Sequence, residues 1–359
     1  MLTIFLGAGF GRTADLPLAR NILDDVPQMD RDVRNVLARV VRARWHAWRR
    51  ENHGTVEQYL AYLEGLPRRW GSIESRVQEW EDATKLVGLN IATRMGQVNH
   101  GNYQGIRHHD IYRTTGFPEY EQFWNEIFRR TTDVSVMTTN YDLLAERGIR
   151  AIPLKPGGKQ VRPGFHYGMP GEWLAGSGPA FSSLRGDPVL RGSVPLMKLH
   201  GSVNWLLTSA GIKHYFNCWP AIYATPALVA PVENKSVPSW ATPVWDAAHD
   251  ALRQSDDLLF IGYSLPPYDH AVADLLQSSV RDETRVHIMD PNRRVTDRFR
   301  ELLPRCFVQN HGSFPRGIRR FLSAWYPYYS REARSETIRW PRREPAYGLP
   351  HRPFVVSDP

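Results

Sequence analysis

Five short β-rich runs, each passing into glycine or polar residues, constrain the fold of this chain more than any other feature. They lie at Leu2–Leu6, 134–142, 193–207, 256–264 and 285–292. Segments with apolar residues three or four positions apart lie between and after them, and this spacing predicts helices. Repeats of strand, turn and helix indicate a parallel sheet covered on both faces. The expected fold class is therefore α/β, a Rossmann-like parallel sheet with helices on both faces and a mainly helical insertion.

The domain organisation follows from the same pattern. One domain is expected over residues 1–325, followed by a basic C-terminal extension over 326–359. Its sheet-forming core comes from residues 1–25, 131–152 and 194–325. Two insertions interrupt this core, a helical one at about 26–130 and an irregular one at about 153–193, which is rich in Gly, Pro and Arg and has no period.

Composition excludes several classes of protein. No window approaches the ~18 uninterrupted apolar residues of a membrane span. The opening residues lack the basic region and the small-residue cleavage site of a signal peptide. Cys218 and Cys306 are the only cysteines, too few for a disulfide framework or a structural zinc site. We therefore expect a cytoplasmic protein.

Positive charge is concentrated in two segments. The net charge is +8, and much of the excess lies in residues 31–52 and 331–345. In the first segment Val36, Val40 and Val41 fall near one helical face, with arginines elsewhere. Basic stripes of this kind bind nucleic acid, but arginine-rich helices more often serve as solvated faces or protein interfaces. We favour protein contact or solubility over nucleic acid.

Polar and glycine residues recur at the predicted strand ends. Ligands of parallel sheets bind beyond the carboxyl ends of the strands. Gly7, Asn140, His200, Ser264 and Asp290 all lie at or near such ends. We therefore expect these residues to line one crevice.

The first glycine turn is Gly7-Ala8-Gly9. Its glycines would let backbone N–H groups approach a pyrophosphate at a helix N-terminus. Arg12 stands where GxGxxG has its third glycine, so the dinucleotide fingerprint is incomplete. A simple tight turn is the alternative.

Two further strand ends carry groups suited to a sugar. Asn140 offers a donor and an acceptor and Asp142 an acceptor, although either residue could instead cap the following helix. His200 follows another strand, with Gly201 beside it to leave room for a ligand. Histidine is the natural base near neutral pH, and a structural histidine is the alternative.

The last two strand ends supply Gly262 and Asp290. Gly262 forms a second glycine turn, with Ser264 close behind it. The carboxylate of Asp290 suits the vicinal diol of an adenosine ribose. Asp290 could otherwise cap a turn with Pro291.

Together these segments resemble the sirtuin superfamily (silent information regulator 2 type). GAG (7–9) resembles the sirtuin GAG(I/F)S turn, and TTNYD (138–142) resembles the TQNxD motif. LHG (199–201) resembles the segment of the catalytic histidine, and GYS (262–264) resembles the GTS segment. The order of TTNYD, KLHGSVNW, a helix with Trp245, Ala248 and Leu252, and FIGYSLPPYD resembles more specifically the bacterial sirtuin-like anti-phage defence group. The resemblance spans residues 1–325.

This resemblance implies that NAD is the substrate. It implies that Asn140 positions the nicotinamide ribose and an attacking water, and that His200 acts on the ribose hydroxyls as a base. The residues it places around the rest of NAD are Gly7, Ala8 and Gly9 at the phosphates, Asp142 near the carboxamide, and Gly262, Ser264 and Asp290 toward the adenosine half.

The chain departs from the sirtuin deacylases in one respect that bears on the reaction. They carry a four-cysteine zinc module between the LHG and GTS segments, and here that interval holds only Cys218. No zinc is therefore expected. We favour an NAD+ glycohydrolase that releases nicotinamide and ADP-ribose, or a cyclic form. The alternatives are an NAD-dependent protein-lysine deacylase and a non-catalytic NAD or ADP-ribose sensor subunit.

An enzyme that depletes NAD without restraint kills its host, as in abortive infection. We therefore expect control by homo-oligomerisation or by a partner. The resemblance suggests a HerA-like ATPase, a short Argonaute or a phage-derived activator, and the sequence does not choose among them.

Overall fold

The computed structural model describes residues 1–14, 16, 22–23, 33–54, 56–65, 73–97, 118–149, 164–169, 171–175, 182–183, 194–215, 218, 220–221, 224–229 and 237–325. The basic C-terminal extension at 326–359 and most of the segment at 153–193 lie outside these residues.

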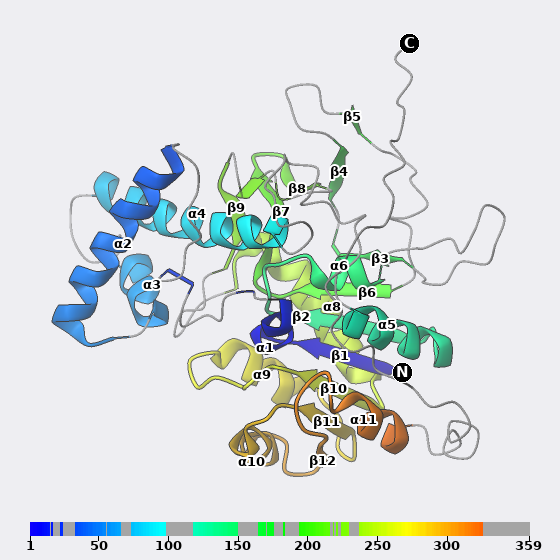
Figure 1. The fold of residues 1–359 in the computed structure, drawn as a ribbon. Coiled ribbons are helices and arrows are strands. Elements are labelled where there is room, and N and C mark those ends of the chain that lie inside the picture. The colour runs from blue at the N-terminus through cyan, green and yellow to red at the C-terminus, as the bar shows by residue number, and fades with distance from the viewer. Residues whose placement is uncertain are drawn as a thin grey trace.

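Seven strands form the main sheet, in the order β12-β11-β10-β1-β2-β6-β3 (Figure 1). Every neighbouring pair is parallel. The strands are β1 (Leu2–Leu6), β2 (Val134–Thr138), β3 (Phe165–His166), β6 (Val194–Lys198), β10 (Asp257–Ile261), β11 (Arg285–Met289) and β12 (Phe307–Asn310). Apart from β3, this is the strand order of a doubly wound dinucleotide-binding sheet. The predicted Rossmann-like fold class is confirmed.

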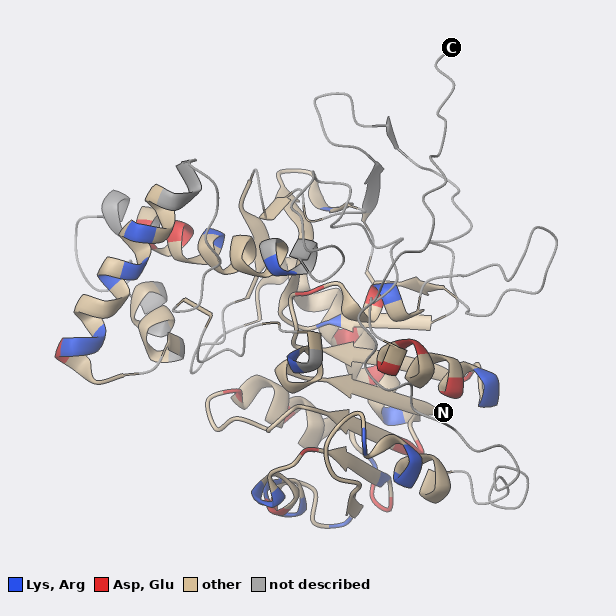
Figure 2. Ribbon diagram, viewed as in Figure 1, with Lys and Arg blue, Asp and Glu red and all other residues tan. Residues whose placement is uncertain are grey.

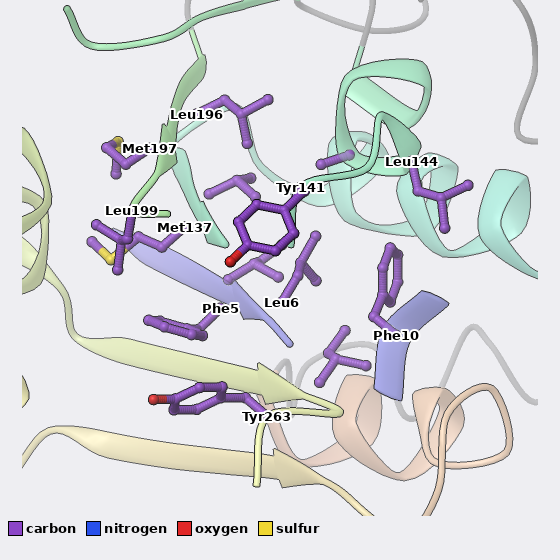
Figure 3. Close-up of a cluster of buried hydrophobic side chains, with 14 of the residues drawn as sticks. Phe5, Leu6, Phe10, Met137, Tyr141, Leu144, Leu196, Met197, Leu199 and Tyr263 are labelled. Atoms are coloured by element: carbon purple, nitrogen blue, oxygen red, sulfur yellow. The ribbon is translucent and has the colours of Figure 1, made fainter. Parts of the chain in front are cut away.

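The central strands are apolar because both faces of the sheet are covered. All five residues of β1, β2 and β10 are buried. Their side chains pack into a continuous core, in which Phe5 lies beside Tyr263 (Figure 3). The two ring centroids are 4.6 Å apart. Burial of such side chains stabilises the sheet by roughly 1.5–3 kcal/mol for each large residue.

Six helices follow or precede these strands and pack around the sheet (Figure 1). They are α5 (Pro118–Arg130), α6 (Leu144–Ile149), α8 (Thr242–Gln254), α9 (His270–Ser279), α10 (Arg293–Leu302) and α11 (Ile318–Trp325). β12 is not among the five strand runs that the sequence indicates. α10 is rich in arginine and buries only Val295, Thr296 and Phe299, so its apolar stripe is too sparse to stand out in the sequence.

A second sheet has the order β5-β4-β8-β7-β9. Its strands are β4 (Glu172–Ala175), β5 (Ser182–Ser183), β7 (Gly201–Thr208), β8 (Gly211–Tyr215) and β9 (Pro226–Leu228). β3, β4 and β5 fall in the segment expected to be irregular, so that expectation is wrong for these three short strands. Strands of two to four residues carry too little pattern to be recognised, and their pairing depends on β6 and β8 elsewhere in the chain.

Three helices form the insertion that precedes α5. They are α2 (Val33–Asn52), α3 (Val56–Gly65) and α4 (Ile73–Gln97), and they extend to one side of the sheet (Figure 1). Trp45 and Tyr59 join α2 to α3, with ring centroids 5.4 Å apart. α4 also contacts β7 and β9, so it links the insertion to the second sheet.

The buried face of α2 differs from the expected one. Val41 is buried, but Val36 and Val40 are exposed by 52% and 38%. The core side of the helix is formed by Ala38, Val41 and Trp45 instead. Figure 2 shows basic residues along the described part of α2. The exposed part of this helix is therefore a mixed surface of arginine and valine.

Among the described residues, no helix is long and apolar enough to cross a membrane.

Because two histidines are buried, we expect the free energy of unfolding to decrease as the pH falls below neutrality. Burial lowers the pKa of His214 to about 3. Burial, with smaller contributions from His287 and Arg320, lowers the pKa of His311 to about 4. The unfolded chain, in which histidine has its ordinary pKa of about 6.5, therefore binds more protons than the folded chain below that pH. The stability is fully present above about pH 6.5 and is lost progressively toward pH 4.

We expect each of these histidines to cost about 2 kcal/mol of unfolding free energy between pH 7 and pH 5. Urea unfolding at both pH values measures this. In His214→Phe, which keeps a ring beside Tyr167 and Trp205, the loss should be about 2 kcal/mol smaller. The partly exposed His249 provides the control variant His249→Gln, which should behave as wild type. An unchanged loss in His214→Phe would contradict the prediction.

Candidate active site at the carboxyl edge of the sheet

The structure brings every candidate site residue to one edge of the main sheet. Five neighbouring strands, β6, β2, β1, β10 and β11, carry them just beyond their carboxyl ends. In that order the residues are His200 after β6, Asn140 and Asp142 after β2, Gly7, Ala8 and Gly9 after β1, Gly262 and Ser264 after β10, and Asp290 after β11. Because the strands are parallel and adjacent, their ends form a single row.

The centre of this row is the topological switch point. From β1 the chain passes to β2 and β6 on one side, and it later crosses to β10, β11 and β12 on the other. The connections that leave β1 and β10 therefore run in opposite directions. Ligands of open parallel sheets bind at such a point.

The two glycine turns at the switch point pack against each other. The N–H of Gly9 donates to the carbonyl of Gly262 over 2.9 Å, and that of Gly7 donates to Ile261 over 3.0 Å. A Cβ on Gly7 would lie 2.5 Å from the Cα of Tyr263. Gly262 has a φ of +63°, and a Cβ there would lie 2.3 Å from the nitrogen of Phe10. Close contact between the two turns therefore accounts for these glycines, a reason that neither the phosphate interpretation nor the simple tight turn included.

The first turn continues into α1 (Ala8–Gly11), a single helical turn. Its position is held from outside, because the hydroxyl of Tyr120 on α5 donates to the carbonyl of Phe10. The ring of Phe10 packs edge-on against Tyr120 with centroids 4.7 Å apart. The turn is therefore a fixed wall of the site.

Asn140 is tied across the ends of β1 and β2. Its Nδ2 donates to the carbonyl of Gly7 over 3.0 Å, and its backbone N–H donates to Oγ1 of Thr138 over 2.9 Å. Since the Gly7 carbonyl can only accept, the amide nitrogen must face it. The amide oxygen is therefore directed away from Gly7. The side chain is half-buried, which leaves it partly accessible.

Asp142 serves the start of α6. Its Oδ1 accepts from the N–H of Leu144 over 2.8 Å. The side chain therefore caps the start of α6, which is the alternative considered from the sequence. Burial raises the pKa of this carboxyl, and the nearby Lys198 opposes that effect. Lys198 also donates to the backbone carbonyl of Asp142.

His200 lies one strand away from Asn140. The N–H of Leu199 donates to the carbonyl of Thr138 over 2.9 Å, which holds the end of β6 against the end of β2. The imidazole is buried, with 4% exposure, and its ring centroid lies 6.4 Å from that of Tyr141. Gly201, beside it, has a φ of +80°, and a Cβ there would lie 2.0 Å from the carbonyl oxygen of Ala227. The approach of β9 therefore requires this glycine.

Sequence reasoning missed a carboxylate beside this histidine. Oδ1 of Asp269 lies 3.6 Å from Nε2 of His200, and both side chains are buried. Asp269 ends the FIGYSLPPYD segment and stands immediately before α9. The segment itself was recognised, but nothing in its spacing indicates that its last residue reaches back to β6.

Ser264 and Asp290 mark the other end of the row. Ser264 is exposed, and its backbone carbonyl accepts from Arg298 over 3.0 Å. Oδ1 of Asp290 accepts from the N–H of Asn292 over 2.8 Å, so Asp290 closes the turn that contains Pro291. Burial raises the pKa of Asp290.

Within the described part of the chain, no group of three or more His, Cys, Asp or Glu residues is arranged to hold a metal ion. Cys218 and Cys306 form no disulfide with each other.

No family model matches the chain, and no curated protein matches it. The chain is similar to several solved Sir2 structures. One is a triply substituted Sir2 homologue with 2′-O-acetyl-ADP-ribose, at 14% identity over 94% of both chains and a TM-score of 0.43. Another is a substituted Sir2 homologue with ADP-ribose, at 14% identity over 94% of both chains and a TM-score of 0.42. A third is Sir2 with an inhibitor, 2′-O-acetyl-ADP-ribose and a deacetylated peptide, at 12% identity over 90% of this chain and 94% of that chain, with a TM-score of 0.41.

The fold class follows from the strand order and the parallel pairing of the main sheet. The chemistry that the site can perform follows from its side chains. It joins a fixed amide and a buried imidazole at neighbouring strand ends, next to two glycine-containing turns.

Proposed function

We propose that this chain is a sirtuin-like NAD+ glycohydrolase, which binds NAD along the carboxyl edge of the main sheet and cleaves its nicotinamide–ribose bond. One observation carries the proposal. Asn140 and His200 follow the neighbouring strands β2 and β6, and the hydrogen bond from Asn140 to Gly7 joins them to the glycine turns at the switch point. A sheet with this strand order binds a dinucleotide at that point.

The order of the strand ends gives the dinucleotide a direction. Asn140 and His200 lie on the β2 and β6 side, which would take the nicotinamide ribose. Gly262, Ser264 and Asp290 lie on the β10 and β11 side, which would take the adenosine half. The remaining assignments are Gly7, Ala8 and Gly9 beneath the phosphates and Asp142 toward the carboxamide end.

The glycine turn would meet the phosphates mainly because Gly7 and Gly9 carry no side chains and Ala8 carries only a methyl group. The N–H groups of Gly7 and Gly9 are already bonded to Ile261 and Gly262, so they are not the donors that the sequence suggested. The carboxylates of Asp142 and Asp290 likewise accept from backbone N–H groups. Each keeps a second oxygen, and a carboxylate can accept several hydrogen bonds.

The reaction needs placement and electrostatics more than acid catalysis. The C1′–N bond breaks, and its electron pair neutralises the positive charge on the nicotinamide ring. A lone pair of water forms the new bond to C1′ and the water proton leaves to solvent, while His200 acts as a base on a ribose hydroxyl and raises the electron density of the sugar. The products are nicotinamide, ADP-ribose and a proton. The developing charge at C1′ resembles that in glycoside hydrolysis, with a better leaving group.

In this scheme Asn140 orients the ribose and the attacking water. Its amide is held by Gly7 on one side and directs its oxygen away from that bond, so it is pre-organised. Pre-organised polar groups are the largest contribution in many active sites. The imidazole of His200 acts as the general base.

Hydrolysis is favoured over deacylation by what lies between β6 and β10. The described part of this interval contains β7, β8 and β9 of the second sheet and a single buried cysteine, Cys218. Four thiolates for a zinc module are not available from two cysteines in the chain. If a cyclic product forms, an internal nitrogen of the substrate replaces water at C1′.

We further propose that the enzyme is cytoplasmic and acts in anti-phage defence. Its activity would then be restrained by self-association or by a regulatory partner such as a HerA-like ATPase, a short Argonaute or a phage-derived activator. The arginine-rich α2 helix with its exposed Val36 and Val40 supports a contact surface. Size-exclusion light scattering that shows only monomer at full activity would exclude control by self-association.

One assay separates the three functional classes. The purified protein is incubated with NAD, with and without an acylated lysine peptide, and the products are resolved by chromatography. Without peptide, we expect nicotinamide to accumulate together with an equal amount of ADP-ribose or its cyclic form. Strict dependence on the peptide would identify a deacylase. The assay is repeated on the full complex with any co-purifying partner. If that complex binds NAD but leaves it intact, the protein is a sensor.

A further inference from the structure

A chain of three buried side chains leads from β10 to His200. Tyr263 follows β10, and its hydroxyl donates to Oδ2 of Asp269 over 2.9 Å. Oδ1 of the same carboxylate lies 3.6 Å from Nε2 of His200. Tyr263, Asp269 and His200 are exposed by only 4%, 3% and 4%.

We propose that Asp269 is the positioning residue of His200, holding the proton on Nε2 so that Nδ1 is the basic nitrogen of the active site. This inference rests on the proposed function, because it assigns the base to an atom. It adds a residue and a tautomer to the site.

The tautomer follows from the charge of the carboxylate. An ionised carboxylate only accepts hydrogen bonds, so the imidazole nitrogen that faces it is the protonated one. A neutral imidazole carries one proton, and its other nitrogen, Nδ1, is left with the lone pair. A carboxylate that fixes the imidazole in this way also stabilises the imidazolium that forms when the base accepts a proton.

Asp269 does not use its side chain to cap the helix that it precedes. It stands at the N-cap position of α9, where aspartate ordinarily accepts from the first helical N–H groups. Its side chain makes no such capping bond. The carboxylate turns instead toward Tyr263 and His200, although burying a charge is costly without partners.

Tyr263 holds the carboxylate in place. Its ring packs on Phe5 with centroids 4.6 Å apart. Burial, reinforced by the charge of Asp269, raises the pKa of Tyr263 well above its ordinary value. The hydroxyl therefore stays protonated and donates to Asp269 at any pH at which the protein is studied.

Within the part of the chain that the structure describes, Tyr141 is another titratable side chain beside His200, with ring centroids 6.4 Å apart. Its hydroxyl donates to the carbonyl of Val229 over 2.6 Å, so this hydrogen bond does not go to His200. Asp269 is thus the charged neighbour to which we assign the pH dependence of His200.

Asp269→Asn tests the assignment. An amide can donate to Nε2, so it favours the opposite tautomer and removes the charge. We expect the rate of NAD cleavage to fall by about 100-fold. We also expect the acid-side midpoint of the pH–rate profile to move down by about one pH unit, because the imidazolium loses its counter-charge. Circular dichroism should show the wild-type fold.

The tautomer is measured without substrate. Two-bond ¹H–¹⁵N spectra of the imidazole groups distinguish Nε2–H from Nδ1–H, and His200→Gln identifies the signals of His200 by their loss. We expect Nε2–H in wild type and a larger share of Nδ1–H in Asp269→Asn. Nδ1–H in wild-type protein would overturn the proposal.

A second buried pair supplies the matched control. Nε2 of His287 lies 3.1 Å from Oδ1 of Asp257, and both side chains are buried. Asp257 begins β10, so this pair lies away from the carboxyl edge. Asp257→Asn should therefore lower stability and leave the pH–rate profile unchanged. A shift of that profile equal to the shift in Asp269→Asn would overturn the proposal.

Failure of the proposed function and failure of this inference give different results. If wild-type protein cleaves no NAD, the hydrolase proposal fails, while the spectra of His200 still decide the role of Asp269. If wild type cleaves NAD and Asp269→Asn retains its rate and its pH profile, the inference alone fails.

Discussion

Replacing Asn140 with alanine is expected to reduce the rate of NAD cleavage by about 10²- to 10³-fold and to leave the fold intact. The side chain is half-buried and makes one described hydrogen bond, to the carbonyl of Gly7. Its loss therefore removes a pre-organised amide from the reacting centre at small structural cost. His200→Ala should have an effect of at least the same size, because the base is lost.

Initial rates of nicotinamide release measure the effect, with thermal unfolding to check the fold. The chain offers a matched asparagine at the same edge of the sheet. Asn292 caps α10 by accepting from the N–H of Arg294 over 3.1 Å, and it has no role in the proposed chemistry. Asn292→Ala should lower stability by about 1 kcal/mol and retain activity. Full activity in both Asn140→Ala and His200→Ala would disprove the assignment of the site.

The largest loss of stability is expected from Lys198→Met. Lys198 and Glu146 are both fully buried, with Nζ 2.8 Å from Oε1, and the hydroxyl of Tyr167 donates to the same oxygen over 3.0 Å. Removing the ammonium leaves a buried carboxylate without its counter-charge. Breaking one half of such a pair costs about 3–5 kcal/mol.

The double variant Lys198→Met with Glu146→Gln should recover most of that loss, because the uncompensated charge is gone and Gln can still accept from Tyr167. Urea unfolding at neutral pH measures all three proteins. Arg300→Met is the control, since Arg300 and Asp297 are 59% and 61% exposed and such surface pairs contribute about 0–1 kcal/mol. A loss below about 1 kcal/mol in Lys198→Met would mean that the buried pair contributes no more than a surface pair.

The strands of the main sheet could be predicted because their burial is complete. A strand covered on both faces must be apolar at every position, as in β1 and β10, and such a run is visible in a sequence without knowledge of its neighbours. That the strand ends lie together was also predictable. Once the strands are parallel, their carboxyl ends share an edge.

Contacts between distant segments were not predictable in this way. β3 has two residues and exists only because β6 pairs with it. Val36 and Val40 fit an apolar helical face, but the neighbouring helices cover Val41 and Trp45 instead. The position of Asp269 relative to His200 depends on how α9 packs beside the end of β6, and no spacing along the chain encodes that.

The glycine turns show a related ambiguity. A glycine is needed wherever backbone approaches closely, whether the neighbour is a phosphate or another part of the chain. At Gly7 and Gly262 the neighbour is the opposite turn. The sequence signal for a close approach was therefore sound, and only the structure identifies what approaches.

The place of β1 in the sheet has a consequence for how the molecule assembles. This strand comes first along the chain and lies in the middle of the sheet, where it pairs with β2 and with β10 more than 250 residues away. During synthesis β1 can pair with β2 well before β10 has left the ribosome, and chains rich in such long-range pairings fold slowly. A chain cut short before β10 would therefore lack the half of the proposed NAD site that β10 and β11 carry.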